Sequence, residues 1–288
     1  MRILITGGSG FVGSNLADYL TLKGHKVTIY DLKKSKWLNS KQVFIKGSLF
    51  SKNLTKAIKN QDVIYNFAAI SDIDEAIKYP MKTANTNIIG TLNILELIKN
   101  KKIKRFVQAS SIYVNSNNGS FYRCSKKASE EFIEEYSKLY GIKYSIIRYG
   151  SIFGERSDLK NGVYKLIHSG IKNNKISYYG FKKSVRRYIH VQDVCRGSLK
   201  VLDKKYENSH ILLTGNKDIK VIDLMKIISE RLKTDMIEFR NEKISGHYVK
   251  TPFTYKPKKG KYLKLNNMLN FKKSINNLIT NILKNESL

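Results

Sequence analysis

Tyr122 and Lys126 are the residues whose types and spacing point most directly to chemistry. They form a Y-x-x-x-K pair, and residues four apart on a helix share one face. Because an ammonium group stabilises a nearby phenolate, we expect Lys126 to lower the pKa of Tyr122. A tyrosine tuned in this way can take or return a hydroxyl proton while a hydride moves to or from a nicotinamide. The pair by itself is a common coincidence, so its meaning depends on the rest of the chain.

A glycine-rich turn near the N-terminus supplies the context that the pair needs. In "ITGGSGFVGSNLADYL", residues 5–20, an apolar strand pattern precedes the turn and an amphipathic helix pattern follows it. The turn contains Gly7, Gly10 and Gly13. Glycines allow a tight turn and a close approach of the backbone, and the N-terminus of the following helix attracts a pyrophosphate. The stretch therefore predicts a dinucleotide site.

An acidic residue at the end of the next strand indicates which dinucleotide binds. Asp31 closes "KVTIYD", residues 26–31, and its carboxylate can accept hydrogen bonds from the hydroxyls of the adenosine ribose. This favours NAD as the cofactor. Lys33 and Lys34 keep NADP open as an alternative, because their ammonium groups could bind a 2′-phosphate.

The elements that must hold these residues alternate between short apolar strands and longer helical patterns. Strands are expected at residues 2–6, 26–31, 43–47, 62–69, 105–111, 144–150 and 210–215. Helices are expected at residues 13–23, 54–59, 83–100 and 122–140. This alternation is typical of a parallel sheet covered on both faces. The predicted fold class is α/β, a Rossmann-type doubly wound parallel sheet with a smaller C-terminal substrate-binding domain.

The pattern becomes irregular beyond residue 148, and this change sets the expected domain division. Residues 1–154, together with about 186–215, are predicted to form the NAD-binding Rossmann domain. Residues from about 155 to 185 and from 216 to 288 contain shorter helices and segments rich in Tyr, Lys and Asn. They are predicted to form the substrate-binding domain.

Seven segments carry a resemblance to a known family: "TGGSGFVGSNL", "YNFAA", "NTNIIGTLN", "QASSIYV", "YRCSK", "IIRYGSIFG" and "RRYIHVQDV". In this order and spacing they resemble the extended short-chain dehydrogenase/reductases, and within these the NAD-dependent nucleotide-sugar epimerases and dehydratases. The resemblance covers nearly the whole chain. It implies a homodimer paired through the helices at 83–100 and 122–140, and enzymes of this kind commonly serve polysaccharide biosynthesis.

The resemblance also implies roles for individual residues. Ser111 would steady the substrate oxygen, Tyr122 would be the acid/base, and Lys126 would hydrogen-bond the nicotinamide ribose. Aligning the chain's Val114-Asn115 with the family's Val-Tyr pair selects Ser111 rather than Ser110. Asn87 would support the site, although helix packing is an equally simple role for it. The cofactor-binding set is Gly7, Gly10, Phe11, Val12, Gly13, Asp31, Ala68, Ala69, Asn87, Tyr122, Lys126 and Tyr149.

On the substrate side, the resemblance points to Ser71, Ser111, Tyr122, Ser151 and Arg186. Arg186 matches an arginine that pairs with the substrate diphosphate, and a guanidinium fork suits phosphate oxygens. Arg187 would then be a second cation beside that diphosphate. The expected partner is a nucleoside-diphosphate sugar, and no metal site is expected.

Departures from the family pattern narrow the reaction. Dehydratases and decarboxylases of the family carry an acid after the serine, where this chain has Ile112 and Tyr113. This favours epimerisation at C4, through loss of a hydride to NAD, a transient 4-keto sugar and return of the hydride to the other face. A nucleotide-sugar 4-dehydrogenase or 4-ketoreductase is the alternative. Gly47-Ser48 and Asn115-Ser116 also depart from the pattern, so the adenine contact and the edge of the sugar pocket are expected to differ.

The net charge of +30 arises from 53 Lys and Arg against 23 Asp and Glu. A charge of this size could attract nucleic acid or a membrane surface, but the lysines are scattered and a general compositional bias is the simpler cause. A non-catalytic nucleic-acid-binding Rossmann module is therefore the less favoured alternative. Two cysteines are too few for a disulfide framework or a metal cluster. With no signal-peptide pattern and no apolar run that could span a bilayer, a cytoplasmic location is expected.

Overall fold

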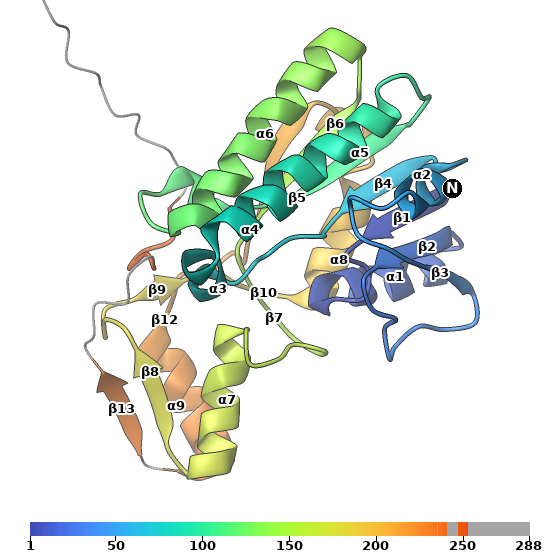
Figure 1. The fold of residues 1–288 in the computed structure, drawn as a ribbon. Coiled ribbons are helices and arrows are strands. Elements are labelled where there is room, and N and C mark those ends of the chain that lie inside the picture. Colours follow the sequence, from blue (N-terminus) through green and yellow to red (C-terminus); the bar gives the residue numbers. More distant parts are fainter. Residues whose placement is uncertain (235, 241–246, 253–288) are drawn as a thin grey trace, which may run out of the picture. The chain divides into compact units, whose positions relative to one another are not determined.

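A fully parallel sheet forms the centre of the fold, so the carboxyl ends of its strands meet at one edge. The computed structural model describes residues 1–234, 236–240 and 247–252. The seven-stranded sheet has the order β11-β6-β5-β4-β1-β2-β3 (Figure 1). Its strands are β1 (Arg2–Thr6), β2 (Lys26–Asp31), β3 (Gln42–Lys46), β4 (Val63–Asn66), β5 (Arg105–Ser111), β6 (Tyr144–Tyr149) and β11 (Ser209–Leu213). Every neighbouring pair runs parallel, which confirms the expected α/β class.

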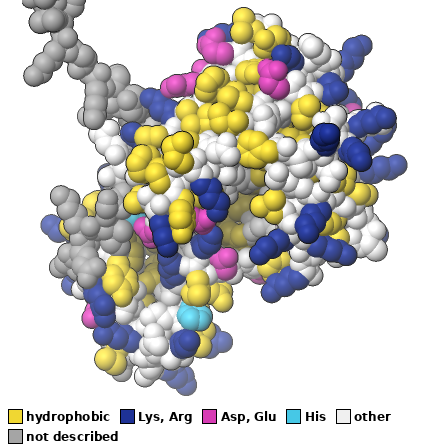
Figure 2. Space-filling model, in the orientation of Figure 1, with side chains coloured by type: hydrophobic (Ala, Val, Ile, Leu, Met, Phe, Trp, Pro, Cys, Tyr) yellow, Lys and Arg dark blue, Asp and Glu magenta, His cyan; other side chains and the backbone are white. Residues whose placement is uncertain are grey.

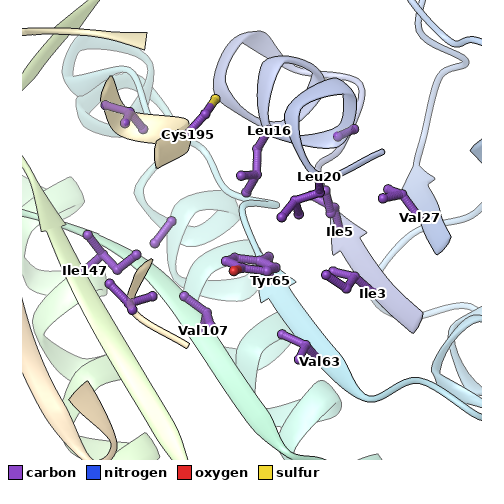
Figure 3. Packing of buried hydrophobic residues seen from close by; sticks show 14 of the residues in the cluster. Ile3, Ile5, Leu16, Leu20, Val27, Val63, Tyr65, Val107, Ile147 and Cys195 are labelled. Atoms are coloured by element: carbon purple, nitrogen blue, oxygen red, sulfur yellow. The ribbon is translucent and has the colours of Figure 1, made fainter. Parts of the chain in front are cut away.

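Alternate side chains of the strands point into two hydrophobic cores, one on each face of the sheet. Ile3 and Ile5 of β1 belong to one core, and Leu4 between them belongs to the other. The first core is completed by α1 (Phe11–Leu22) and α8 (Val191–Lys200), as Figure 3 shows for Leu16, Leu20 and Cys195. The second core is completed by α2 (Asn53–Ile58), α5 (Gly90–Ile98) and α6 (Ser120–Tyr140). The sheet is therefore doubly wound.

The helix expected at residues 83–100 is made of three consecutive elements. Helix α4 (Pro80–Ala84) begins earlier, a π-helical turn follows at Asn85–Ile89, and α5 continues the chain. The turn places the Asn87 side chain on the backbone of Ile70, with two hydrogen bonds of 2.8 and 3.0 Å. The chain is thus helical over nearly the whole predicted range, and the π-helical turn within it was not predicted.

The strand expected at residues 62–69 is also shorter than predicted. It ends at Asn66, because the next residues pass directly over the glycine turn, where Ala68 lies against Gly7. Helix α6 starts two residues earlier than predicted, at Ser120. Gly119 precedes it with a left-handed φ of +98°, a conformation that suits glycine. Strands β1, β2 and β5 have the predicted bounds, and the other shared elements differ from the prediction by at most two residues at either end.

A smaller third core lies outside the large sheet. It contains Leu166 of α7 (Gly162–Asn173), Ile176 of β8 (Ile176–Tyr179), and Met225 and Ile228 of α9 (Val221–Leu232). The other elements are α3 (Ile73–Lys78), β7 (Ser151–Phe153), β9 (Val185–Arg186), β10 (Tyr188–His190), β12 (Ile219–Lys220), β13 (Ile237–Arg240) and 3₁₀ turns at Ile112–Asn115 and Lys204–Tyr206. The domain division stays a prediction, and residues 253–288 of the expected second domain lie outside the described residues.

Among the helices that the structure describes, none combines the length and the apolar character needed for a membrane span.

Candidate active site

The glycine turn joins β1 to α1 and touches the segment that follows β4. Gly7 has a φ of +68°, and a Cβ atom on it would lie 2.5 Å from the backbone nitrogen of Ala68. A Cβ atom on Gly13 would collide with the carbonyl oxygen of Gly7. Only glycine therefore allows the turn, the following segment and the helix start to come so close. Helix α1 begins directly behind the turn, and Gly10 occupies its cap position without a side chain.

A cavity of about 740 Å³ opens over this turn at the carboxyl edge of the sheet. Eleven of the twelve predicted cofactor-binding residues line it: Gly7, Gly10, Phe11, Val12, Gly13, Asp31, Ala68, Ala69, Tyr122, Lys126 and Tyr149. Tyr149 directs its hydroxyl away from the cavity, to Ser198 Oγ at 2.8 Å. The structure thus brings together residues that are spread over three-fifths of the described sequence.

Asp31 stands at the end of β2, where it is tied to the glycine turn. One carboxylate oxygen accepts the Ser9 backbone N–H at 3.0 Å, and the other accepts the Lys33 backbone N–H at 3.3 Å. The Lys33 and Lys34 side chains are exposed, and neither residue lines the cavity. The group that faces the cavity at this strand end is therefore the carboxylate.

The departure at Gly47-Ser48 has a local explanation. The Tyr30 hydroxyl donates a 2.6 Å hydrogen bond to the Ser48 carbonyl, and a Cβ atom on Gly47 would collide with that hydroxyl. Sequence reasoning missed Leu32 and Phe50, which also line the cavity and are 62% and 48% exposed. Their signal was available, because both are large apolar residues just after expected strands.

Tyr122, Lys126 and Ser111 lie at the inner end of the cavity. Lys126 Nζ is 5.9 Å from the centroid of the Tyr122 ring and donates a 2.9 Å hydrogen bond to the Ala109 carbonyl. The Ser111 hydroxyl is within hydrogen-bonding reach of Tyr122. It also accepts the Tyr113 backbone N–H at 3.3 Å, which starts the 3₁₀ turn after β5.

The electrostatics of the pair differ from the expectation. Burial raises the pKa of Tyr122 to about 12, and the Ser111 hydrogen bond acts in the opposite direction. Burial also lowers the pKa of Lys126 to about 8, against the attraction of Glu130. The expected lowering of the Tyr122 pKa by Lys126 is therefore wrong for this structure. The phenolate loses more by leaving water than it gains from an ammonium group that is directed at a carbonyl oxygen.

Asn87 does not line the cavity but holds two of its walls together. Its Oδ1 accepts the Ile70 backbone N–H, and its Nδ2 donates to the Ile70 carbonyl and to Ser125 Oγ at 2.9 Å. Ser125 lies on α6 between Tyr122 and Lys126. Asn87 therefore fixes the segment after β4 against the helix that carries the pair.

A second cavity, of about 970 Å³, adjoins the first. It contains the five residues predicted to bind substrate: Ser71, Ser111, Tyr122, Ser151 and Arg186. The two cavities share Ser71, Ser111, Tyr122, Gly150 and Ile152 in their linings. The candidate acid/base and its serine therefore face both spaces.

Arg186 and Arg187 have different surroundings. Arg186 is only 8% exposed, lines the second cavity, donates to the Val185 and Val249 carbonyls, and stacks on Tyr248 with its guanidinium carbon 4.3 Å from the ring centroid. Arg187 pairs with Asp218 at 2.7 Å and does not line the cavity. The expectation of a second cation beside the diphosphate is wrong, because neighbouring residues of an extended chain point in opposite directions.

An aromatic wall in the second cavity was not predicted. The Tyr113 hydroxyl lies 3.0 Å from His247 Nδ1, and the Tyr113 ring centroid is 4.6 Å from that of Tyr248. Tyr113 also meets the Tyr122 ring edge-on at 6.3 Å. Only the place of Tyr113 after Ser111 gave a signal, because His247 and Tyr248 come from a distant segment.

Comparisons with known proteins agree with this geometry. The family model described as "NAD dependent epimerase/dehydratase family" matches residues 3–214. A putative UDP-glucose 4-epimerase of Methanocaldococcus jannaschii is 32% identical over 264 residues, with 84% of each chain covered. A UDP-N-acetyl-alpha-D-glucosaminuronate decarboxylase of Bacillus cytotoxicus is 31% identical, with 77% of each chain covered. The UDP-glucose 4-epimerase of Thermotoga maritima, solved with UDP-glucose, has a TM-score of 0.80 and 25% identity, and the match covers 88% of this chain and 90% of that one.

The Gly7→Ala variant tests the close approach at the glycine turn. A methyl group there must push the Ala68 backbone away and distort the first cavity, so we expect the affinity for NADH to fall on the order of tenfold or more, which is about 1.4 kcal/mol. A fluorescence titration with NADH measures it. Gly24→Ala is the matched control, because Gly24 also has a positive φ, +80°, but has open space around it. Equal affinities in the two variants would contradict the argument.

Proposed function

Because the chain belongs to the NAD-dependent epimerase/dehydratase family of enzymes, we propose that it is a nucleotide-sugar 4-epimerase that works through a transient 4-keto sugar. The observation that carries the proposal is the meeting of two cavities at Tyr122 and Ser111. One cavity suits a dinucleotide and the other a nucleotide sugar, and a hydride can pass between them only where they meet. Curated relatives with 4-epimerase names, such as the Methanocaldococcus jannaschii protein, support the choice of reaction.

The residues of the first cavity fit NAD. Gly7 and Gly13 form a cradle that a Cβ atom would fill, which suits the close approach of a pyrophosphate. The Asp31 carboxylate suits two ribose hydroxyls and would repel the 2′-phosphate of NADP, which is our reason for proposing NAD.

The proton chemistry is assigned to the chain itself. NAD, when bound, supplies the hydride acceptor and donor. Tyr122, as its phenolate, takes the proton of the C4 hydroxyl as the sugar becomes a ketone, and as the resulting phenol returns it when the other face of the ketone is reduced. Ser111 hydrogen-bonds the same sugar oxygen and shares the proton network of Tyr122. Lys126, kept as an ammonium group, holds the nicotinamide ribose.

The second cavity supports a nucleoside diphosphate sugar as substrate. Arg186 is buried in its wall and presents a guanidinium group for the diphosphate. Ser71 and Ser151 add hydroxyl groups in the same lining. The Tyr248 ring stacks on Arg186, and the Tyr113 ring contacts those of Tyr248 and Tyr122. The two rings therefore border the space between Arg186 and Tyr122, where the sugar would bind. Cytoplasmic location and the absence of nucleic-acid binding stay predictions.

Tyr122→Phe tests the acid/base role. The variant keeps the ring but removes the group that carries the proton, so we expect turnover to fall by about 10²- to 10⁴-fold while NAD(H) still binds. Turnover is measured by nuclear magnetic resonance on a panel of nucleotide sugars, and cofactor content by mass spectrometry. Tyr136→Phe is the control on the same helix, because its hydroxyl bonds Glu96 at the surface. Full activity of Tyr122→Phe would rule out the assignment.

The redox balance of the reaction tests epimerisation itself. An epimerase returns the hydride that it takes, so we expect no net change in the absorbance of reduced nicotinamide at steady state. We also expect the purified protein to carry NAD(H). Steady accumulation or loss of NADH in proportion to product would instead identify a dehydrogenase or ketoreductase.

A homodimer through α4, α5 and α6 is also part of the proposal. Figure 2 shows hydrophobic side chains gathered over α5 and α6, and Met81, Ile89, Phe132 and Leu139 are 81%, 44%, 43% and 72% exposed. Burying them against a second copy removes apolar surface from water. We expect Phe132→Lys to shift the protein toward monomer in sedimentation experiments. Leu22→Lys, at an 84% exposed position on α1, is the control. A wild-type protein that sediments as a monomer would refute this assembly.

A further inference from the structure

Three side chains on one face of α6 contact three successive residues at the end of β5. The contacts are Tyr122 with Ser111, Lys126 with the Ala109 carbonyl, and Glu130 with Ser110. Positions four apart on a helix share a face, so the three side chains form one row. The first two belong to the proposed catalytic machinery, and the third, Glu130, has no role assigned so far.

Glu130 is only 2% exposed, and both oxygens of its carboxylate accept hydrogen bonds. Oε1 accepts Ser110 Oγ at 2.5 Å and Arg148 Nε at 3.1 Å. Oε2 accepts an Arg148 terminal nitrogen at 2.6 Å and lies 3.5 Å from His210 Nδ1. Burial alone would raise the pKa of Glu130, but the nearby His210 and the hydrogen bonds from Arg148 and Ser110 bring it below its ordinary value. The carboxylate is therefore charged at neutral pH.

Arg148 links the Glu130 carboxylate to the chain on the other side of Ser111. Its second terminal nitrogen lies 3.3 Å from Asn115 Oδ1, at the end of the 3₁₀ turn that Ser111 starts. Ser110 before the serine and Asn115 after it are thus held by one Glu130–Arg148 pair. Asn115, a departure from the family pattern, gives this chain an amide oxygen that can accept from the guanidinium group.

Glu130 is also an electrostatic partner of Lys126. It lies one helical turn further along α6, and its charge acts against the burial that lowers the pKa of Lys126 to about 8. The titratable groups that surround the two residues are Tyr122 on α6, Arg148 on β6 and His210 on β11. Glu130 raises the pKa of His210, whose other nitrogen bonds Glu134 at 2.6 Å.

We propose that Glu130, through Arg148 and Asn115, is a positioning residue that fixes Ser111 against Tyr122. The inference rests on the proposed function for its catalytic consequence. Its structural part is the row of contacts from Tyr122, Lys126 and Glu130 to the end of β5, which we call the ladder. The ladder is independent of which sugar is turned over. Glu130 touches neither of the two cavities, so its effect passes through the residues that do.

The decisive comparison is between Glu130→Gln and Glu134→Gln. Both remove one carboxylate from the same face region of α6, and both carboxylates contact His210, but only Glu130 joins the ladder. We expect Glu130→Gln to lower kcat on the order of 10- to 100-fold with KM for the sugar nucleotide nearly unchanged, because a small misplacement of reacting groups has an effect of this size. Glu134→Gln should retain wild-type kcat. Equal kcat values in the two variants would overturn the proposal.

The pH dependence of NADH affinity tests whether the charge of Glu130 acts on Lys126 or whether Glu130 has only a structural role. Lys126 must keep its proton to hold the ribose, and without the Glu130 charge its pKa falls further. As the pH is raised, NADH affinity should therefore begin to fall at a lower pH in Glu130→Gln than in Glu134→Gln. Making both variants in a His210→Gln background removes the titration of the imidazole from the comparison. Coincident profiles would overturn the action of the Glu130 charge on Lys126.

Asn115→Ala keeps the test decisive if Glu130→Gln does not fold, because it leaves the buried ion pair intact. We expect it to lower kcat about fivefold, the effect of one ordinary hydrogen bond, with KM nearly unchanged. Wild-type kcat in this variant would overturn the proposed effect of Arg148 on Ser111 through Asn115 and the 3₁₀ turn. If the wild-type protein turns over no nucleotide sugar while the NADH profiles still separate, the proposed function fails and the ladder stands.

Discussion

The close approach of two backbone segments, Gly7 and Ala68, is the constraint on which the rest of the site depends. The ends of β1 and β4 are neighbours in the sheet, and the chain leaves both in the same direction. With no side chain between them, the glycine turn can lie flat against the segment after β4 and leave the first cavity above it. Asp31, Ser9 and the start of α1 all take their positions from that turn.

The strand order then determines how the proposed chemistry is divided. β1, β2 and the segment after β4 border the dinucleotide side, while β5 and β6 lead to the residues shared by both cavities. Helix α6 contacts the end of β5 and contributes the proposed acid/base Tyr122, Lys126 and the buried carboxylate of Glu130 in one row. Long-range hydrogen bonds, such as those of Asn87 to Ile70 and Ser125, make this arrangement rigid.

Much of this could be predicted from the sequence, because local patterns encode it. The alternation of apolar strands with helices predicts the fold class. Eleven of the twelve cofactor-binding residues expected from the glycine turn, the Y-x-x-x-K spacing and the family resemblance line the first cavity. The failures share a physical cause. The Tyr122 pKa depends on how deeply the folded chain buries the phenol, Arg187 pairs with Asp218, and the π-helical turn places Asn87 on the Ile70 backbone. Each is a tertiary effect that no local spacing reveals.

Tyr30 and Gly47 restrict how this chain can change over evolutionary time. The Tyr30 hydroxyl fills the space that any side chain at position 47 would need, and it is held there by the Ser48 carbonyl. A Cβ atom on residue 47 would also collide with Ser51 Oγ, so a larger residue there requires changes at both Tyr30 and Ser51. The three positions are therefore epistatic, and this wall of the first cavity can change only through coupled substitutions.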